Sequence, residues 1–311
     1  MPAPDSRRTD HPYLVDRLED LPEGLQQLAG QGLAAGETAE TIFAMPAQWL
    51  PMDFGRRGGM HLVPERALLF TGRGALYVQG AGRSGEPGQA IYLPGSQLFY
   101  TRLIQVLLYG RLEFYIAAGD RLRRIVVEYN TVGHDLLKPA LQRFLRLAWE
   151  QKPSGRPSPG VDQTETMLQA LGEQSYKFRG GLQGYGLLPG ECLRGFVFQP
   201  RITQRILGIF PRLIAPAAVF ALTEKSFVAI EEGRTNATSY GWFVTYCPRH
   251  YVSGVSVAPH AQWQDVCVQM QKGDLQDKYL ATVEEKSALA LRGLWQGEML
   301  NTELTHHASR E

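Results

Sequence analysis

The chain has 311 residues, which exceeds the usual size of one domain and is enough for two domains with connecting segments. Apolar residues make up 44% and charged residues 20%, a globular composition that excludes the disordered, collagen-like and membrane-embedded classes. The net charge is only +1, and the chain has neither a Lys/Arg-rich run nor an aromatic-basic RNA signature. We therefore expect no nucleic-acid partner.

The first residues are polar and lack the apolar segment of a secretory signal. The most apolar stretch, residues 206–222, is interrupted by Pro211 and Pro216 and is too short to form a membrane-spanning helix. Three cysteines without C-x-x-C spacing favour a reducing compartment. We expect a cytoplasmic location, with peripheral contact to the inner membrane as the alternative. The cysteines are Cys192, Cys247 and Cys267.

Residues 1–35 are expected to form an N-terminal helical extension. Five leucines follow one another at alternating spacings of four and three, which places them on one helical face, and Pro22 must begin a new helical turn. This stripe predicts a packing surface. The leucines are Leu14, Leu18, Leu21, Leu25 and Leu28.

Three landmarks occur twice in the same order along the chain. Each is a short turn motif next to an apolar segment, and the two occurrences lie 154, 152 and 154 positions apart. Because chance matches would scatter, the near-constant spacing predicts a duplicated domain. The matched positions are Glu37 with Glu191, Thr71 with Thr223, and Pro94 with Pro248.

Each copy is expected to be an antiparallel sheet followed by one helix, an α+β class that is mainly β. Short β-branched or aromatic segments bounded by Gly, Pro and Asn predict hairpins, such as the pair around the Thr71 turn. Apolar residues at helical spacing predict one helix at the C-terminal end of each copy. These residues are Leu137, Leu141, Phe144 and Leu145 in the first copy, and Leu280, Val283, Leu291, Leu294 and Trp295 in the second.

A Pro/Gly/Ser-rich segment at residues 152–160 is typical of a linker. After it, Asp162 can cap a short helix that carries Leu168 and Leu171. The predicted organisation is therefore an extension at 1–35, a first domain at 36–150, a linker with a short helix at 151–185, a second domain at 186–296 and a disordered tail at 297–311.

The second copy resembles the bacterial pleckstrin-homology-like (PH-like) domains of the GRAM type. The resemblance rests on four motifs and the closing helix, covers residues 186–296 and extends through the repeat to 36–150. It implies a strongly bent seven-stranded sheet, or partly open barrel, closed by one C-terminal helix. It also implies a module that binds lipids, peptides or proteins, without catalytic residues. The motifs are Leu188-Pro189-Gly190-Glu191, the hairpin of residues 221–228, Tyr240-Gly241 and Tyr246-x-Pro248.

The loop after the first strand of the second copy combines apolar and basic residues. In PH-like folds this loop rims the open end of the barrel, so it suits an anionic lipid surface. An apolar loop of this kind also marks contacts with another domain or a protein partner. The candidate binding residues are Arg201, Arg205, Ile206, Leu207, Ile209, Phe210 and Arg212, with Arg56 and Arg57 in the corresponding loop of the first copy.

The sequence was searched for motifs typical of catalytic and metal-binding sites. The chain contains no nucleophile elbow, Walker loop, H-E-x-x-H motif or dinucleotide fingerprint. Thiolate and imidazole side chains could in principle hold zinc, but their spacing lacks any close pair. We predict no catalytic residue, no metal and no cofactor. The residues considered for zinc are Cys247, His250, His260 and Cys267.

The favoured function is therefore a non-enzymatic binding or scaffold protein whose two PH-like domains mediate assembly with a protein partner or as a homo-oligomer. The first alternative is a peripheral membrane protein that binds anionic lipid through the loop between Arg205 and Arg212. The second is an enzyme whose site is assembled from scattered side chains.

Overall fold

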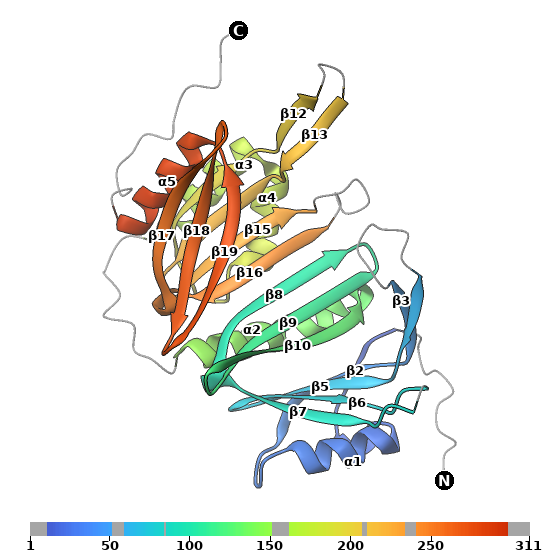
Figure 1. The fold of residues 1–311 in the computed structure, drawn as a ribbon. Helices are drawn as coiled ribbons and strands as arrows, with labels where there is room; N and C mark the ends of the chain where they lie inside the picture. Colours follow the sequence, from blue (N-terminus) through green and yellow to red (C-terminus); the bar gives the residue numbers. More distant parts are fainter. Residues whose placement is uncertain are drawn as a thin grey trace. The chain divides into compact units, whose positions relative to one another are not determined.

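The computed structural model describes residues 11–51, 59–83, 85–150, 162–206, 210–233 and 241–297, with only the backbone of Glu150 and Ile206. The described part of the chain is mainly β and contains several antiparallel sheets, none of which closes into a barrel (Figure 1). This agrees with the expected α+β, mainly β class.

The chain divides into two compact units. The first comprises residues 1–156 together with 232–245, and the second comprises residues 157–231 together with 246–311.

The first unit contains a five-stranded sheet in the order β1-β2-β5-β6-β7, a three-stranded meander β8-β9-β10 and the two-stranded hairpin β3-β4. All the pairings are antiparallel. The strands are β1 (Tyr13–Val15), β2 (Ala39–Met45), β3 (Gln48–Pro51), β4 (Met60–Val63), β5 (Arg66–Thr71), β6 (Gly74–Gln79), β7 (Gln89–Pro94), β8 (Leu98–Val106), β9 (Tyr109–Ala118) and β10 (Arg121–Asn130). The helices are η1 (Leu18–Asp20), α1 (Glu23–Gly32), η2 (Gly95–Gln97), η3 (Thr131–Gly133) and α2 (His134–Glu150).

Two helices cover the faces of the five-stranded sheet. Helix α1 lies against β6 and β7, where Leu25 and Ala29 join a buried cluster with Leu69 and Leu76 (Figure 1). On the other face, the ring centroid of Phe144 on α2 lies 6.0 Å from that of Phe70 on β5 and 5.7 Å from that of Phe114 on β9. Helix α2 therefore packs between the sheet and the meander.

The second unit opens with helices and continues with strands in an order like that of the first. Strands β11, β14 and β15 are neighbours in one sheet, and β17-β18-β19 form a separate three-stranded meander. The next strand of the first of these sheets, β16, begins in residues 242–245, which belong to the first unit, and ends in residues 246–248 of the second. The strands are β11 (Leu193–Gln199), β12 (Ile202–Ile206), β13 (Phe210–Ala215), β14 (Ala218–Thr223), β15 (Ser226–Glu232), β16 (Trp242–Pro248), β17 (Val252–His260), β18 (Trp263–Lys272) and β19 (Leu275–Val283). The helices are α3 (Thr164–Gln174), α4 (Tyr176–Gly181), η4 (Leu182–Gly186), η6 (Arg249–Tyr251) and α5 (Glu285–Gln296).

Aromatic contacts hold the layers of the second unit together. Tyr279 on β19 lies with its ring centroid 6.2 Å from those of both Phe220 and Phe227, on β14 and β15. The ring centroid of Phe178 on α4 lies 5.2 Å from that of Phe198 on β11. Helix α5 lies against β11, β17 and β18. The meander and helices therefore cover the hydrophobic faces of the sheet strands.

Irregularities of the backbone recur at matching positions in the two units. A register shift in β2–β5 pairing between Ala39 and Thr41 has its counterpart in β11–β14 pairing between Leu193 and Gly195, 154 positions later. Positive φ angles recur with the same spacing. They are found at Gly36 and Gly190, Leu107 and Ala261, and Gly119 and Gly273.

Two local predictions are wrong. Leu14 lies in β1, which pairs with β2, so the five-leucine stripe is not one helical face, and α1 begins only after Pro22. Leu280 and Val283 lie in β19, where burial alternates, and α5 begins at Glu285. The short helix predicted after Asp162 is present as α3, which carries the buried Leu168 and Leu171, and α4 and η4 follow it. Within the residues described, no helix combines the length and hydropathy needed to span a membrane.

Candidate interaction surfaces

The predicted binding loop of the second unit is a two-stranded hairpin, β12–β13, which we call the second arm. Arg205 lies on β12, while Phe210 and Arg212 lie on β13, and all three side chains are exposed. Phe210 is exposed to 64%. Arg201 directly precedes the arm and is also exposed. The loop is therefore an ordered hairpin where it is described, because β12 and β13 pair along five positions.

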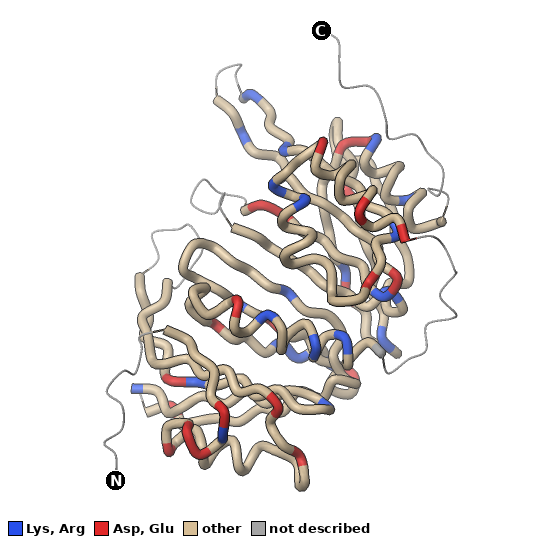
Figure 2. Tube along the Cα trace, turned by 180° about the vertical axis from the view of Figure 1, so that it is seen from behind, with Lys and Arg blue, Asp and Glu red and all other residues tan. Residues whose placement is uncertain are grey.

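The basic residues of the second arm do not share one face. Residues opposite each other in an antiparallel pair point to the same side, and Gln204 pairs with Arg212 while Arg205 pairs with Pro211. Phe210, two positions before Arg212, shares its face, and Arg205 lies on the other. Figure 2 shows basic and no acidic positions along the described strands of the arm. The arm therefore presents one arginine on each side.

Several predicted site residues cannot be placed. Leu207 and Ile209, and Arg56 and Arg57 in the corresponding loop of the first unit, lie outside the described residues, as does the side chain of Ile206.

The first unit carries a hairpin at the corresponding position, β3–β4, which we call the first arm. Its outer face is formed by the pairs Trp49 with Leu62 and Pro51 with Met60. Trp49 is exposed to 59% and Met60 to 54%. An exposed tryptophan and an exposed methionine on the same face of a hairpin are typical of protein interfaces. The sequence analysis did not single out these residues, because Trp49 stands directly before the apolar Leu50 and nothing in the local pattern marks it as exposed.

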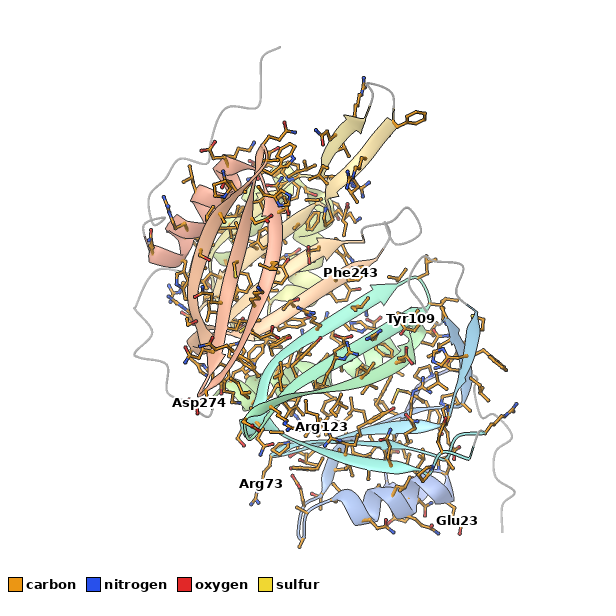
Figure 3. The ribbon with its side chains drawn as sticks, in the orientation of Figure 1. Glu23, Arg73, Tyr109, Arg123, Phe243 and Asp274 are labelled. Carbon is orange, nitrogen blue, oxygen red and sulfur yellow. The ribbon has the colours of Figure 1, made fainter. Side chains whose placement is uncertain are left out.

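The inner face of the first arm is fixed to the meander. Leu50 and Val63 form a buried cluster with Tyr109 of β9, whose position is labelled in Figure 3. His61 Nε2 lies 3.2 Å from Glu128 Oε2 on β10, and the Tyr109 hydroxyl donates to the other carboxylate oxygen of Glu128. Burial, together with this hydrogen bond and the Glu128 charge, raises the pKa of Tyr109. The outer face is thus presented on a fixed support.

Beneath the first arm lies a fully buried arginine, Arg66. Its Nε donates to the carbonyl oxygen of Glu128 at 2.8 Å and one terminal nitrogen donates to the carbonyl oxygen of Pro64 at 2.7 Å. Burial lowers its pKa to about 10, and the charges of Tyr77 and Glu128 oppose this shift. Because Arg66 bonds to the backbone of Pro64, directly after β4, and to that of Glu128 on β10, it ties the arm to β10, and its full burial leaves no accessible charge for a ligand.

A glutamate at the entry to the first sheet strand anchors a hairpin turn in each unit. In the first unit, Thr71 donates to Glu37 Oε1 at 2.5 Å and Tyr92 donates to the same oxygen at 2.7 Å. In the second, Ser226 donates to Glu191 Oε2 at 2.9 Å. Thr71 and Thr223 each accept the backbone N–H three residues ahead, at 3.0 and 2.8 Å.

The two glutamates differ in their electrostatics. Burial raises the pKa of the half-buried Glu37, but hydrogen bonds from Thr71 and Tyr92 outweigh it, so this pKa lies below its usual value. Burial dominates at Glu191 and raises its pKa despite the hydrogen bonds it accepts. Ser226 and Glu191 are both buried, so this hydroxyl–carboxylate pair cannot reach a substrate.

The residues considered for zinc do not converge. Cys247 is buried in β16, whereas His260 lies at the exposed end of β17 and pairs with Asp265 at 2.8 Å. No three His, Cys, Asp or Glu side chains gather into a metal-binding group in the part of the chain that the structure describes.

No protein-family model matches the chain. No curated protein matches it with significance.

Proposed function

We propose that this chain is a non-enzymatic binding protein built from two copies of a PH-like module, which binds partner proteins through its two arms. The favoured role is a scaffold that mediates assembly.

The duplication is supported by features that packing alone does not require. The same hydrogen-bonded turn recurs around Thr71 and Thr223, each next to a glutamate that follows a glycine with positive φ. Beside each turn, a backbone N–H donates across to the residue two positions after the threonine, from Gly95 at 2.9 Å and from Arg249 at 2.7 Å. Independent domains would not share these irregularities at a constant spacing.

The PH-like assignment is supported by the order of elements. In the first copy, β2, β5, β6 and β7 of the five-stranded sheet precede the meander β8-β9-β10 and helix α2, and in the second, β11, β14, β15 and β16 precede the meander β17-β18-β19 and helix α5. This succession of strands followed by one helix is compatible with the strand order and C-terminal helix that the sequence resemblance implies. The connection between the first two sheet strands, which rims the open end in PH-like folds, is the arm in both units.

The observation that carries the proposal is the exposure of large apolar side chains on both arms. Trp49, Met60 and Phe210 are each more than half exposed on paired strands. Aromatic residues and methionine are enriched in protein interfaces, and a few such residues contribute most of the binding energy. Because the first arm is fixed by Arg66 and Tyr109, binding there would require little ordering of its backbone.

Affinity capture from native lysate, quantified by mass spectrometry, tests the proposal. The full chain is compared with a first-arm variant, Trp49→Thr with Met60→Thr, and a second-arm variant, Phe210→Thr. We expect at least one protein captured by the unaltered chain to be depleted about tenfold or more by an arm variant, as for an interface hot spot.

The control is Tyr176→Ser on α4, which removes an aromatic side chain exposed to 82% on an element that is not part of either arm. It should leave capture unchanged. Equal capture by the unaltered chain and both arm variants would refute binding through the arms.

The second candidate function is binding to anionic membranes through the second arm, favoured by Phe210 with Arg205 and Arg212 on opposite faces. Apolar side chains inserted among lipids with flanking arginines at the headgroups suit such a surface. Co-sedimentation with vesicles of phosphatidylserine and phosphatidylcholine tests it. Binding by the unaltered chain, weakened by Phe210→Thr and by salt, would favour this function, and absence of binding would exclude it.

A further inference from the structure

The last strand of the first meander, β10, begins with a cluster of exposed arginines. It is the edge strand of its sheet, and it pairs with β9 at 10 consecutive positions without a register shift (Figure 1). A regular, extended edge can accept a further strand, whereas bulges in an edge strand hinder such pairing. The arginines are Arg121, Arg123, which is labelled in Figure 3, and Arg124.

Two hydrogen bonds show which backbone groups of β10 point away from β9. The carbonyl oxygen of Glu128 accepts from Arg66 on β5, so it points outward, whereas the N–H of Thr131 donates to Leu108 in the turn that precedes β9. The N–H and C=O of one residue in an antiparallel strand point to the same side, and the side alternates along the strand. The outward positions before Glu128 are therefore Leu122, Arg124 and Val126.

These outward groups form a short stretch that can pair with another strand. Among the strands that the structure describes, β9 is the only one that pairs with β10. The hydrogen bond from Arg66 to Glu128 closes the outer side of β10 after Val126. We call residues 121–126 the basic edge.

The basic edge has a positive charge that its neighbours do not cancel. Asp120 lies 4.0 Å from Arg121, whose side chain is nevertheless 88% exposed. Arg124 lies 3.9 Å from the buried carboxylate of Glu113, but Arg111 contacts the same carboxylate oxygen more closely, at 2.6 Å. Three arginines thus stand against one exposed acid, and each of the three is available to a ligand.

The arginines lie on both faces of the basic edge. Side chains alternate along a strand, so Arg124 points to one face, and Arg121 and Arg123 point to the other. A strand that pairs with β10 would therefore meet a positive charge on either face. Its best match carries acidic residues at consecutive positions, not at every second one.

The duplicated strand of the second unit shows that this backbone does not require arginine. Strand β19 corresponds to β10, with positions 154 residues apart, as for the other repeated features. Leu275, Asp277 and Lys278 stand there at the positions of the three arginines. The positive charge is thus particular to the first unit.

We infer that the basic edge binds an acidic, extended segment of a partner protein, which adds to the sheet as a strand beside β10. A row of alternating N–H and C=O groups matches an extended polypeptide, and arginines match carboxylates. Phosphates of lipids or nucleic acids offer acceptors alone, so they would leave the outward carbonyl oxygens without donors. A second copy of β10 would bring arginines against arginines. This inference does not rest on the arms, because the basic edge shares no residue with them.

Fluorescence anisotropy with the full chain and two labelled peptides tests the inference. The valine probe has about eight residues, in which pairs of glutamates alternate with single valines. The proline probe has proline in place of each valine, so it keeps the charge but cannot add to a sheet as a strand. We expect the valine probe to bind about tenfold more tightly than the proline probe or better.

Variants of the chain separate the contributions of charge and backbone. Arg121→Gln with Arg123→Gln should raise the dissociation constant of the valine probe about tenfold. Leu122→Pro keeps all three arginines and replaces an N–H that does not bond to β9, so it should abolish binding of the valine probe. The control is Arg83→Gln, an exposed arginine between β6 and β7, which should leave binding unchanged. Circular dichroism verifies folding of all variants.

Amide exchange, resolved by residue with NMR, gives a readout that does not depend on charge. Bound valine probe should slow exchange at Leu122, Arg124 and Val126, whereas Arg123 and Ile125, whose N–H groups face β9, should change little. The inference is overturned if the valine probe does not bind, even where vesicles of phosphatidylserine do, or if both probes bind equally. It is also overturned if exchange at the three outward positions is unchanged. Capture of partners through the arms is measured separately and does not affect these outcomes.

Discussion

The two turn glutamates, Glu37 and Glu191, provide a matched pair of substitutions with opposite expected effects. Glutamine has nearly the same shape as glutamate but no charge, so each variant isolates the carboxylate. Glu37 accepts hydrogen bonds of 2.5 and 2.7 Å from Thr71 and Tyr92 on one oxygen. Hydrogen bonds to a charged group contribute about 1.5–3 kcal/mol, and neutral ones about 1 kcal/mol. Partial exposure reduces this difference, so Glu37→Gln should destabilise the chain at neutral pH by about 1 kcal/mol.

Glu191→Gln should have the reverse effect. The Glu191 carboxyl is buried, and its desolvation outweighs its hydrogen bonds and raises its pKa. A glutamine at this position keeps a hydrogen-bond partner for the Ser226 hydroxyl. It also removes the free-energy cost of burying a charged carboxylate. We expect no loss of stability at neutral pH and a gain of up to about 1 kcal/mol.

The sign of each effect depends on pH. The folded-state pKa of Glu37 is lowered, so its stabilisation is present above the unfolded value of 4.5 and is lost as the pH falls through the folded value. The pKa of Glu191 is raised, so its favourable contribution is present below 4.5 and is lost as the pH rises through the folded value. The gain from Glu191→Gln should therefore appear at neutral pH and disappear in acid.

Urea unfolding, followed by tryptophan fluorescence and circular dichroism at neutral and acidic pH, measures both effects. At neutral pH, Glu37→Gln should lower the midpoint and Glu191→Gln should leave it unchanged or raise it, with unchanged slopes. The reasoning is refuted if both midpoints shift in the same direction, or if Glu191→Gln destabilises the chain as much as Glu37→Gln.

Three further substitutions test individual contacts. Burial lowers the pKa of His134 to about 4, so the chain should lose about 3 kcal/mol as the pH falls from 6.5 to 4, and urea titrations should show a smaller loss for His134→Gln. Arg66→Leu leaves the carbonyl oxygens of Pro64 and Glu128 unsatisfied and should lower the free energy of unfolding by about 3 kcal/mol in the same assay. A Cβ at Gly133 would lie 2.5 Å from Pro12 Cβ, so Gly133→Ala should cost about 1–3 kcal/mol and speed amide exchange in β1.

Local patterns predicted the hairpins well. The segment around Thr71 and its counterpart around Thr223 were expected as two strands with a tight turn, and β5–β6 and β14–β15 have that form. Asp162 was expected at a helix start, and its carboxylate accepts the N–H of Thr164 at 2.9 Å. These features depend on neighbouring residues, so a single sequence contains the necessary information.

Longer-range pairings were not predictable in the same way. Leu14 has helical spacing to later leucines, but pairing of β1 with β2 overrides this periodicity. The strand β19 was assigned to a helix because Leu280 matches helical spacing, although Tyr279, Ala281 and Val283 alternate into the core. The sequence analysis predicted loops at both arms. Whether β3 pairs with β4, and β12 with β13, depends on the conformation of the segment between each pair of strands, which the local sequence pattern does not indicate.

The candidate site was predicted in part. The sequence identified the exposed residues Arg205, Phe210 and Arg212, but not that the two arginines lie on opposite faces, which depends on register. It gave no sign of the basic edge, because the backbone groups of β10 that point away from β9 depend on the pairing of whole strands.

Hydrogen–deuterium exchange of the full chain, with and without a captured partner protein, tests binding through the arms most directly. We predict slower amide exchange at Gln48–Pro51 and Met60–Val63, or at Ile202–Ile206 and Phe210–Ala215, with little change in the meander β17–β19. Protection confined to the helices or the meanders, with exchange in both arms unchanged, would contradict the proposed function.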